Sequence, residues 1–126
     1  MTGPAEVPRA FVTAYRRGDE ARMRSLLAPG VVAYVTNADA GADLVVGPDA
    51  YIERLPDLTG ADIDLDITQS IDVAADQTLA MVQVRAHRKG RELHNYAAFL
   101  ARGVEGQIAE LWMVDAQPAY SDEFWA

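Results

Sequence analysis

Asp115 and His94 are the residues whose type and position best suit proton transfer in this 126-residue chain. Histidine titrates near neutral pH, and a carboxylate turned into an apolar interior becomes able to exchange protons. Tyr34 is a candidate to orient or polarise a carbonyl group. For Asp115, the structural alternative is an exposed, inert acid at a strand end. For His94 and the second histidine, His87, it is a place on a polar sheet face.

Metal and thiol chemistry are not favoured. The chain has no cysteine, which excludes a thiol nucleophile, a disulfide scaffold and a thiolate zinc site. Asp57 precedes an acidic run in which Asp62, Asp64 and Asp66 alternate with apolar residues. This alternation places the three carboxylates in a row on the solvent-exposed face of a strand. It therefore favours a solvated surface over a calcium site. We therefore expect no metal and no cofactor.

The charge and composition of the chain limit the kinds of partner that it can bind. The net charge of −8 and the pI near 4.5 argue against nucleic acid, whose phosphates an acidic surface repels. No apolar run reaches the ~18 residues of a membrane span. Residues Met1–Pro8 lack the basic and apolar segments of a signal peptide. With half its residues apolar, the chain has the composition of one domain over residues 1–126, and we expect it in the cytoplasm.

The first half of the chain predicts helices and short strands. A helix that closes at Arg17–Gly18 follows from five apolar residues spaced at i, i+3, i+4, i+7 and i+8: Val7, Ala10, Phe11, Ala14 and Tyr15. Asp19 can cap a second helix that stops at Pro29–Gly30. The elements expected next are strands Val31–Thr36 and Asp43–Val46, and a helix opening at Pro48.

The second half predicts long antiparallel strands. Polar and apolar residues alternate strictly over Ile63–Ile67. Thr78–Arg88 and Arg91–Arg102 flank a turn at Lys89–Gly90, and Gln107–Asp115 forms the last strand. Four strands in succession without crossover helices indicate an α+β fold rather than an α/β sandwich.

A two-residue turn at Lys89–Gly90 fixes which residues share a face. It pairs His87 with Glu92, Arg85 with His94 and Val84 with Asn95. The face carrying Asn95 and Phe99 is otherwise apolar and should line a pocket, whereas the face carrying His94 is polar. A register error of one residue would exchange the two faces. Asn95 either donates to a substrate carbonyl or oxyanion, or is satisfied by nearby backbone.

Several segments, in order, resemble the nuclear transport factor 2-like superfamily, in its SnoaL-like and ketosteroid isomerase-like branch. These segments are Phe11–Asp19, Leu26–Val31, Gly47–Tyr51, Gly106–Trp112 and Asp122–Trp125. The resemblance covers nearly the whole chain. It implies a cone in which a curved antiparallel sheet with a mixed edge wraps around three N-terminal helices and an internal pocket.

The resemblance also allows the residues of this chain to be compared with the catalytic residues of related enzymes. Ketosteroid isomerase uses a tyrosine, a carboxylate base and a protonated carboxylic acid. Those positions fall here on Phe11, on Tyr34, and on Asn95, Ala98 or Phe99, none of which is a carboxylic acid. The chain is therefore not a ketosteroid isomerase of the known pattern.

Two related enzyme types remain for comparison. SnoaL-like cyclases commonly carry an acid after the last-strand tryptophan, where this chain has Met113, and the nearest carboxylate is Asp115. Limonene epoxide hydrolases need an Asp–Arg–Asp arrangement. Arg85 and Asp115 would supply two of its members, and no third is evident.

The leading hypothesis is a cofactor-independent cyclase, isomerase or lyase that moves a proton on a small hydrophobic, polyketide- or terpenoid-like substrate of secondary metabolism. The substrate-binding candidates are Tyr15, Tyr51, Asn95, Phe99 and Trp112, although the aromatic residues among them could equally be ordinary core. The alternative is a non-catalytic ligand-binding or dimerisation module. We also expect a homodimer through the polar face, where Met81, Tyr96 and Leu100 lie.

Overall fold

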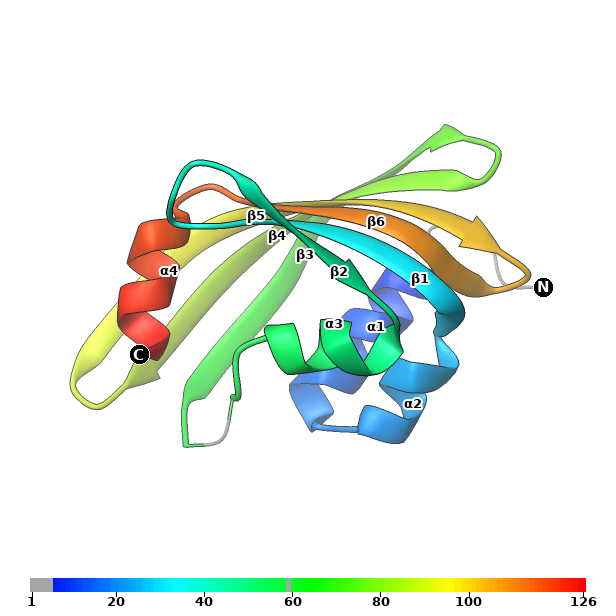
Figure 1. Cartoon of the computed structure of the whole chain (residues 1–126). Helices are drawn as coiled ribbons and strands as arrows, with labels where there is room; N and C mark the ends of the chain where they lie inside the picture. Colours follow the sequence, from blue (N-terminus) through cyan, green and yellow to red (C-terminus); the bar gives the residue numbers. More distant parts are fainter. Residues whose placement is uncertain (1–5, 59) are drawn as a thin grey trace.

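The computed structural model describes residues 6–58 and 60–126, and its elements form one curved sheet with helices beneath it (Figure 1). In chain order they are α1 Glu6–Arg17, α2 Glu20–Ser25, β1 Leu27–Thr36, β2 Ala42–Val46, α3 Pro48–Arg54, β3 Asp62–Ala74, β4 Gln77–Arg88, β5 Arg91–Val104, β6 Gln107–Asp115 and α4 Pro118–Trp125. The strand order is β2-β1-β6-β5-β4-β3. Only the β1–β6 pair is parallel among these neighbours. The predicted α+β cone with a mixed edge is confirmed.

The N-terminal helices form as their sequences predict, with one difference at a boundary. α1 buries Val7, Phe11 and Ala14, and the side chain of Asp19 caps α2 by accepting from the Arg22 N–H at 3.1 Å. α2 ends at Ser25, before the predicted stop at Pro29–Gly30. The reason is that β1 already begins at Leu27, which pairs with β6. Residues that the local sequence signals assigned to the helix therefore belong to the sheet.

The β4–β5 hairpin has the predicted register. Lys89 and Gly90 both have positive φ, 51° and 74°, as a two-residue hairpin turn of type I′ requires. Arg85 pairs with His94 and Val84 with Asn95, so the two faces of this hairpin are those expected. Register shifts in β1, β3 and β5 interrupt the ladders. Such bulges bend strands and help the sheet to arch over the helices.

Helix α4 is an element that the sequence reasoning did not predict. Pro118 lies at its start, where a missing N–H costs nothing, and Phe124 is buried against Ala86 and Leu93. Arg88 and Arg91 donate to the carbonyls of Phe124 and Glu123 in the last turn. α4 therefore closes one end of the arch, at the far end from α2 (Figure 1).

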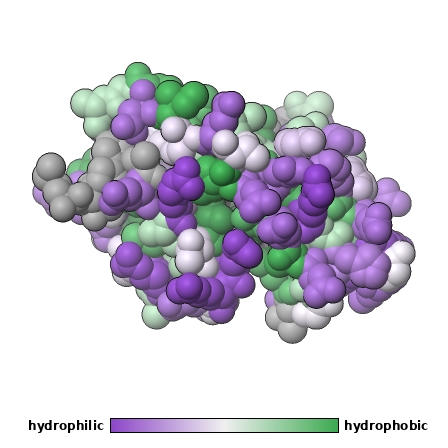
Figure 2. All heavy atoms as spheres, turned by 180° about the vertical axis from the view of Figure 1, so that it is seen from behind, coloured by the Kyte–Doolittle hydropathy of each residue, from purple (hydrophilic) through white to green (hydrophobic). Residues whose placement is uncertain are grey.

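The main core lies between α1–α3 and the concave face of β1, β5 and β6. Its largest fully buried members are Tyr51, Leu27, Ile108, Leu111 and Val31. Seen from behind, the surface is mostly hydrophilic, with hydrophobic residues at its upper edge and in a central hollow (Figure 2). Within the described residues, no helix is both long and apolar enough to cross a bilayer.

Candidate functional site

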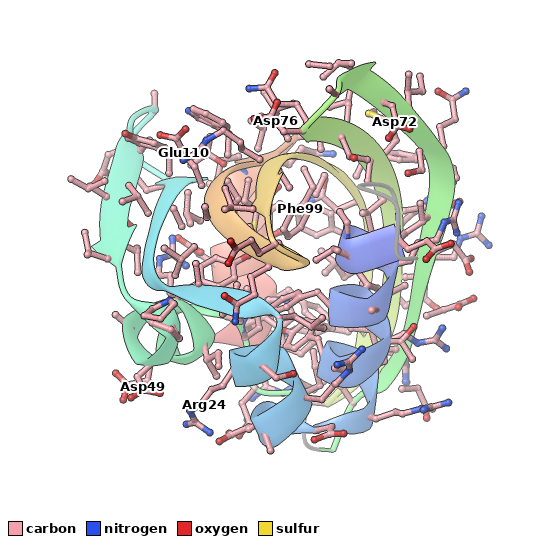
Figure 3. The ribbon with its side chains drawn as sticks, turned by 90° about the vertical axis from the view of Figure 1, so that its right-hand side faces the viewer. Arg24, Asp49, Asp72, Asp76, Phe99 and Glu110 are labelled. Atoms are coloured by element: carbon pink, nitrogen blue, oxygen red, sulfur yellow. The ribbon has the colours of Figure 1, made fainter. Side chains whose placement is uncertain are left out.

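The concave face of the sheet encloses a small apolar hollow, which we call the inner cavity. Its volume is about 100 Å³, and Phe99 lies under the arch of the sheet that covers it (Figure 3). Tyr15 and Ser121 bring the hydroxyl groups to an otherwise apolar wall. The lining residues are Phe11, Val12, Tyr15, Leu55, Pro56, Ile63, Leu65, Val82, Val84, Leu93, Ala97, Phe99, Met113, Ser121 and Trp125. The cavity therefore suits an apolar group and offers it few polar contacts.

A second hollow of about 260 Å³, the mouth, adjoins the inner cavity. The two share five lining residues: Leu55, Pro56, Met113, Ser121 and Trp125. The mouth adds polar groups that the cavity lacks: Thr36, Arg54, Asp115 and Asp122. Arg54 is half-buried there and contacts the Asp43 carboxylate at 3.3 Å. Together the two hollows form an apolar chamber with a polar opening between α3 and α4.

Asp115 lies at the junction of β6 and α4, and both its carboxylate oxygens accept hydrogen bonds. Oδ1 accepts from Asn95 Nδ2 and from the Gln117 N–H, each at 2.7 Å. Oδ2 accepts from Ser121 Oγ, also at 2.7 Å. Asp115 is thus not the free, exposed acid of the structural alternative. It joins the sheet to α4 and borders the mouth.

Asn95 is on the concave face, as expected, with 2 % of its surface exposed. Its Nδ2 donates to Asp115 and, at 2.8 Å, to Ser121 Oγ, while its Oδ1 accepts from the Tyr96 N–H at 2.8 Å. The protein itself thus satisfies the amide. We define the polar cluster as Asn95, Asp115 and Ser121.

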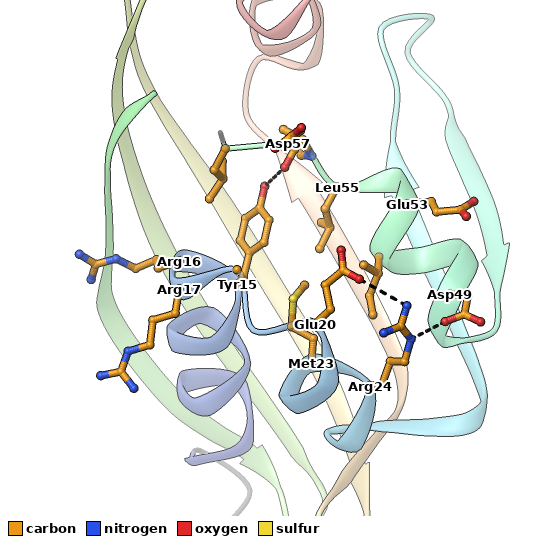
Figure 4. A pocket seen from close by; sticks show the side chains of 14 residues that line it. Tyr15, Arg16, Arg17, Glu20, Met23, Arg24, Asp49, Glu53, Leu55 and Asp57 are labelled. Carbon is orange, nitrogen blue, oxygen red and sulfur yellow. Dashed lines mark hydrogen bonds and ion pairs between the residues drawn. The ribbon is translucent and has the colours of Figure 1, made fainter. Parts of the chain in front are cut away.

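Tyr15 separates the inner cavity from a third hollow, the basal cleft, of about 830 Å³ between α1, α2 and α3. Its hydroxyl donates to the Pro56 carbonyl at 2.6 Å. Burial, and then the nearby Asp57 carboxylate, raise the pKa of the Tyr15 phenol above its ordinary value. Figure 4 shows the charged rim of this cleft, where Arg24 contacts Glu20 and Asp49. These exposed ions pair with one another, which suits a helix junction better than a catalytic centre.

Tyr51 of α3 is fully buried beside the inner cavity. Its hydroxyl contacts Met113 Sδ at 3.7 Å, and its ring lies 5.9 Å from that of Phe11. Burial chiefly, and secondarily Tyr15, raise the pKa of the Tyr51 phenol, while Arg54 acts in the opposite direction. Tyr51 therefore stays a neutral hydrogen-bond donor at physiological pH.

The convex face holds the remaining candidates. His94 is exposed and hydrogen-bonds to the Gln83 side chain at 2.9 Å. Tyr34 stacks on Trp112 with ring centroids 5.5 Å apart. Arg85 pairs with His94 across the hairpin, and so it lies on the opposite face from the Asp115 side chain. The structure thus brings Asn95, Asp115, Phe99, Tyr15 and Tyr51 around the chamber, but not His94, Tyr34 or Trp112.

Sequence reasoning missed Ser121, Arg54 and Trp125 as residues of the chamber. Ser121 and Trp125 belong to α4, whose apolar residues show little helical periodicity. The sequence signal that could have indicated this helix is Pro118, since proline is favoured at the first position of a helix. Arg54 gave no signal of a site, because a basic residue is common in the last turn of a helix, and Arg54 lies in the last turn of α3.

Comparisons with known proteins agree with this architecture. A family model described as a SnoaL-like domain matches residues 9–111. The chain is 33% identical over 132 residues to an uncharacterised protein of Mycobacterium tuberculosis, with 100% of both covered. Bal32a, from a soil-derived mobile gene cassette, superposes with a TM-score of 0.81 at 17% identity, covering 98% of this chain and 96% of that one. An LEH-like epoxide hydrolase of M. tuberculosis gives 0.73 at 12% identity, with 97% and 90% covered. The chain belongs to the SnoaL-like domain family and has the nuclear transport factor 2-like fold.

Proposed function

We propose that this chain binds a small apolar molecule in the chamber and moves a proton on it without a cofactor, as a cyclase, isomerase or lyase. The observation that carries the proposal is the polar cluster at the wall where the apolar cavity meets its polar mouth. An apolar skeleton gains by leaving water for such a cavity. A polyketide- or terpenoid-like ligand fits this chemistry, and the carbon next to its carbonyl group would then lie toward Asp115.

In this proposal Asp115 is the acid–base residue. Ser121 both lines the inner cavity and donates to Asp115 Oδ2, so a rotation of its hydroxyl exposes that oxygen to a ligand. Asp115 would take a proton from a carbon next to a carbonyl and return it elsewhere on the same molecule, which is why no cofactor is needed. Epoxide hydrolysis, the activity of one fold neighbour, is less well supported because Arg85 and Asp115 occupy opposite faces.

A second function, ligand binding without catalysis, is favoured by a specific observation. Three donors already occupy the two oxygens of Asp115, and these contacts hold α4 to the sheet. A carboxylate used in this way can be purely structural. The two functions differ in one respect only, which is whether Asp115 exchanges protons with a bound molecule.

Hydrogen–deuterium exchange separates the two functions before a substrate is known. The protein is incubated in D₂O with a panel of aromatic and polycyclic ketones, and NMR follows exchange at carbons next to the carbonyl. Catalysis predicts accelerated exchange that Asp115→Asn abolishes and that Asp76→Asn, at an exposed position between β3 and β4 away from the chamber, retains. Binding of a ketone without accelerated exchange would identify the binding module. Full exchange in Asp115→Asn would refute the role of Asp115.

We also propose that the convex face forms a homodimer. One residue of each strand meets its neighbours in a row across the whole sheet: Leu44, Tyr34, Trp112, Leu100, Leu79 and Ile71. Leu44 is 63 % exposed and Ile71 50 %. The strands lie about 4.8 Å apart and average about ten residues, or about 33 Å, which gives a face on the order of 800 Å². That is about the area each partner contributes to a standard stable interface.

A further inference from the structure

The hydroxyl of Tyr51 is paired with an unusually poor acceptor. Tyr51 is fully buried, and its hydrogen bond among the described residues goes to Met113 Sδ at 3.7 Å. By contrast, Tyr15 donates to a backbone carbonyl at 2.6 Å and Tyr120 to another at 3.0 Å. A thioether is a weak acceptor, and a buried donor without a good partner costs stability. Tyr51 thus holds a hydrogen bond that an oxygen acceptor would improve.

The group that contacts this hydroxyl, Met113 Sδ, belongs to a flexible side chain. Met113 lines both the inner cavity and the mouth, and methionine is unbranched with three rotatable side-chain bonds. Phe11, whose ring contacts that of Tyr51, also lines the cavity. Tyr51 therefore lies directly behind two residues of the cavity wall. Only the Met113 side chain contacts the phenol hydroxyl by a hydrogen bond among the described residues, so a rotation of that side chain would open the hydroxyl to the cavity.

The surroundings of the phenol favour an oxygen ligand. Arg54 lines the mouth and interacts electrostatically with Tyr51, and Tyr15 is a second phenol within electrostatic reach. Burial keeps the Tyr51 phenol neutral at physiological pH, so it remains a donor. This end of the chamber thus combines the Tyr51 donor with the positive charge of Arg54, whereas the Tyr15 hydroxyl already donates to the Pro56 carbonyl. The polar cluster, with its carboxylate, lies on the side of β5, β6 and α4.

We propose that Tyr51 donates a hydrogen bond to a carbonyl or enolate oxygen of the apolar ligand, with Met113 holding that place in the free protein. The inference rests on the proposed function, because it requires the chamber to take an apolar molecule. It names the ligand class more closely, as an apolar skeleton with an oxygen acceptor at one end. It also gives the ligand an orientation, with that oxygen toward α3.

A matched pair of probes tests the donor separately from the cavity. 2-Acetylnaphthalene and 2-ethylnaphthalene share a ring system and differ in one carbonyl oxygen. Protein-observed NMR titration gives the dissociation constant of each for the wild type and for three variants: Tyr51→Phe, Met113→Leu and Tyr34→Phe. Tyr34→Phe removes a phenol from the convex face and is the matched control.

We expect the wild type to bind the ketone about fivefold to tenfold more tightly than the hydrocarbon, the gain typical of one neutral hydrogen bond. Tyr51→Phe should reduce this ratio to about one or below, because the buried ketone oxygen then has no donor, while leaving the hydrocarbon affinity unchanged. Tyr34→Phe should retain the ratio, and Met113→Leu should retain or raise it, because it removes the thioether that competes for the phenol. The infrared carbonyl stretch of bound ketone should fall to lower frequency in the wild type and in Met113→Leu, which keeps the test informative if Tyr51→Phe folds poorly.

The outcomes separate this inference from the proposed function. If the hydrocarbon binds but the ketone shows no preference, or keeps its preference in Tyr51→Phe, the donor role is refuted and the apolar chamber stands. The same holds if the carbonyl stretch of bound ketone does not shift. If neither probe binds, the chamber fails as an apolar site and the inference fails with it.

Discussion

Asp115→Ala removes one carboxylate on which three donors converge, and it should loosen α4 from the sheet. Hydrogen bonds to a charged group contribute about 1.5–3 kcal/mol each. The Gln117 N–H is exposed and can donate to water instead, so losing its hydrogen bond to Asp115 changes the free energy of unfolding little. Asn95 is buried and Ser121 half-buried, and both lose a partner. The expected fall in the free energy of unfolding is about 3–4 kcal/mol, a large part of the ~5–15 kcal/mol typical of such domains.

Urea unfolding followed by circular dichroism measures this loss. With a slope of about 1.5 kcal/mol/M, the midpoint should fall by about 2–2.7 M. Asp115→Asn keeps one acceptor oxygen and should cost about 1 kcal/mol. Asp122→Ala removes the same charge from an exposed neighbouring position and should change the free energy of unfolding by less than about 0.5 kcal/mol. If Asp115→Ala were no less stable than Asp122→Ala, the polar cluster would not anchor α4.

Three further predictions concern the cavity, the buried phenol and the convex face. Ala97→Leu adds bulk to the wall of the inner cavity, so it should weaken 2-ethylnaphthalene binding at least tenfold in an NMR titration; unchanged affinity would place the ligand elsewhere. The pKa of Tyr51 is raised in the folded state. Its contribution to the free energy of unfolding is therefore complete below the unfolded-state pKa of about 10 and falls at higher pH. Tyr51→Phe should flatten that fall in urea titrations from pH 9 to 11; a parallel fall would contradict it. Leu44→Glu should halve the mass measured by light scattering, whereas a wild-type monomer would refute the dimer.

The sequence was most informative where one local rule acts without competition. The Lys89–Gly90 turn determined the register of the β4–β5 hairpin, and the register placed Asn95 and Phe99 on the concave face. The end of α2 was predicted too far along, because local helix signals do not include the pairing of Leu27 with Ile108, a residue distant in sequence. Helix α4 was missed because its short, weakly periodic sequence is held by contacts with distant strands.

Only part of the chamber could be predicted from the sequence. Asp115 could be singled out as the nearest acid to a family position, but its partners Ser121 and Gln117 depend on α4 and could not be predicted without it. Tyr34 and Trp112 were attractive as aromatic residues, yet strand alternation in β1 and β6 turns them to the convex face. Residue type suggested a pocket, and only the register could assign each side chain to a face.

A crystal structure with 2-acetylnaphthalene bound would show directly whether the chamber on the concave face is the ligand site. We expect the ring system in the inner cavity beside Phe99, with the Met113 side chain displaced. The carbonyl oxygen should lie within about 3 Å of the Tyr51 hydroxyl. A ring system bound instead on the convex face, against Tyr34 and Trp112 with the inner cavity unchanged, would show that the chamber is not the ligand site.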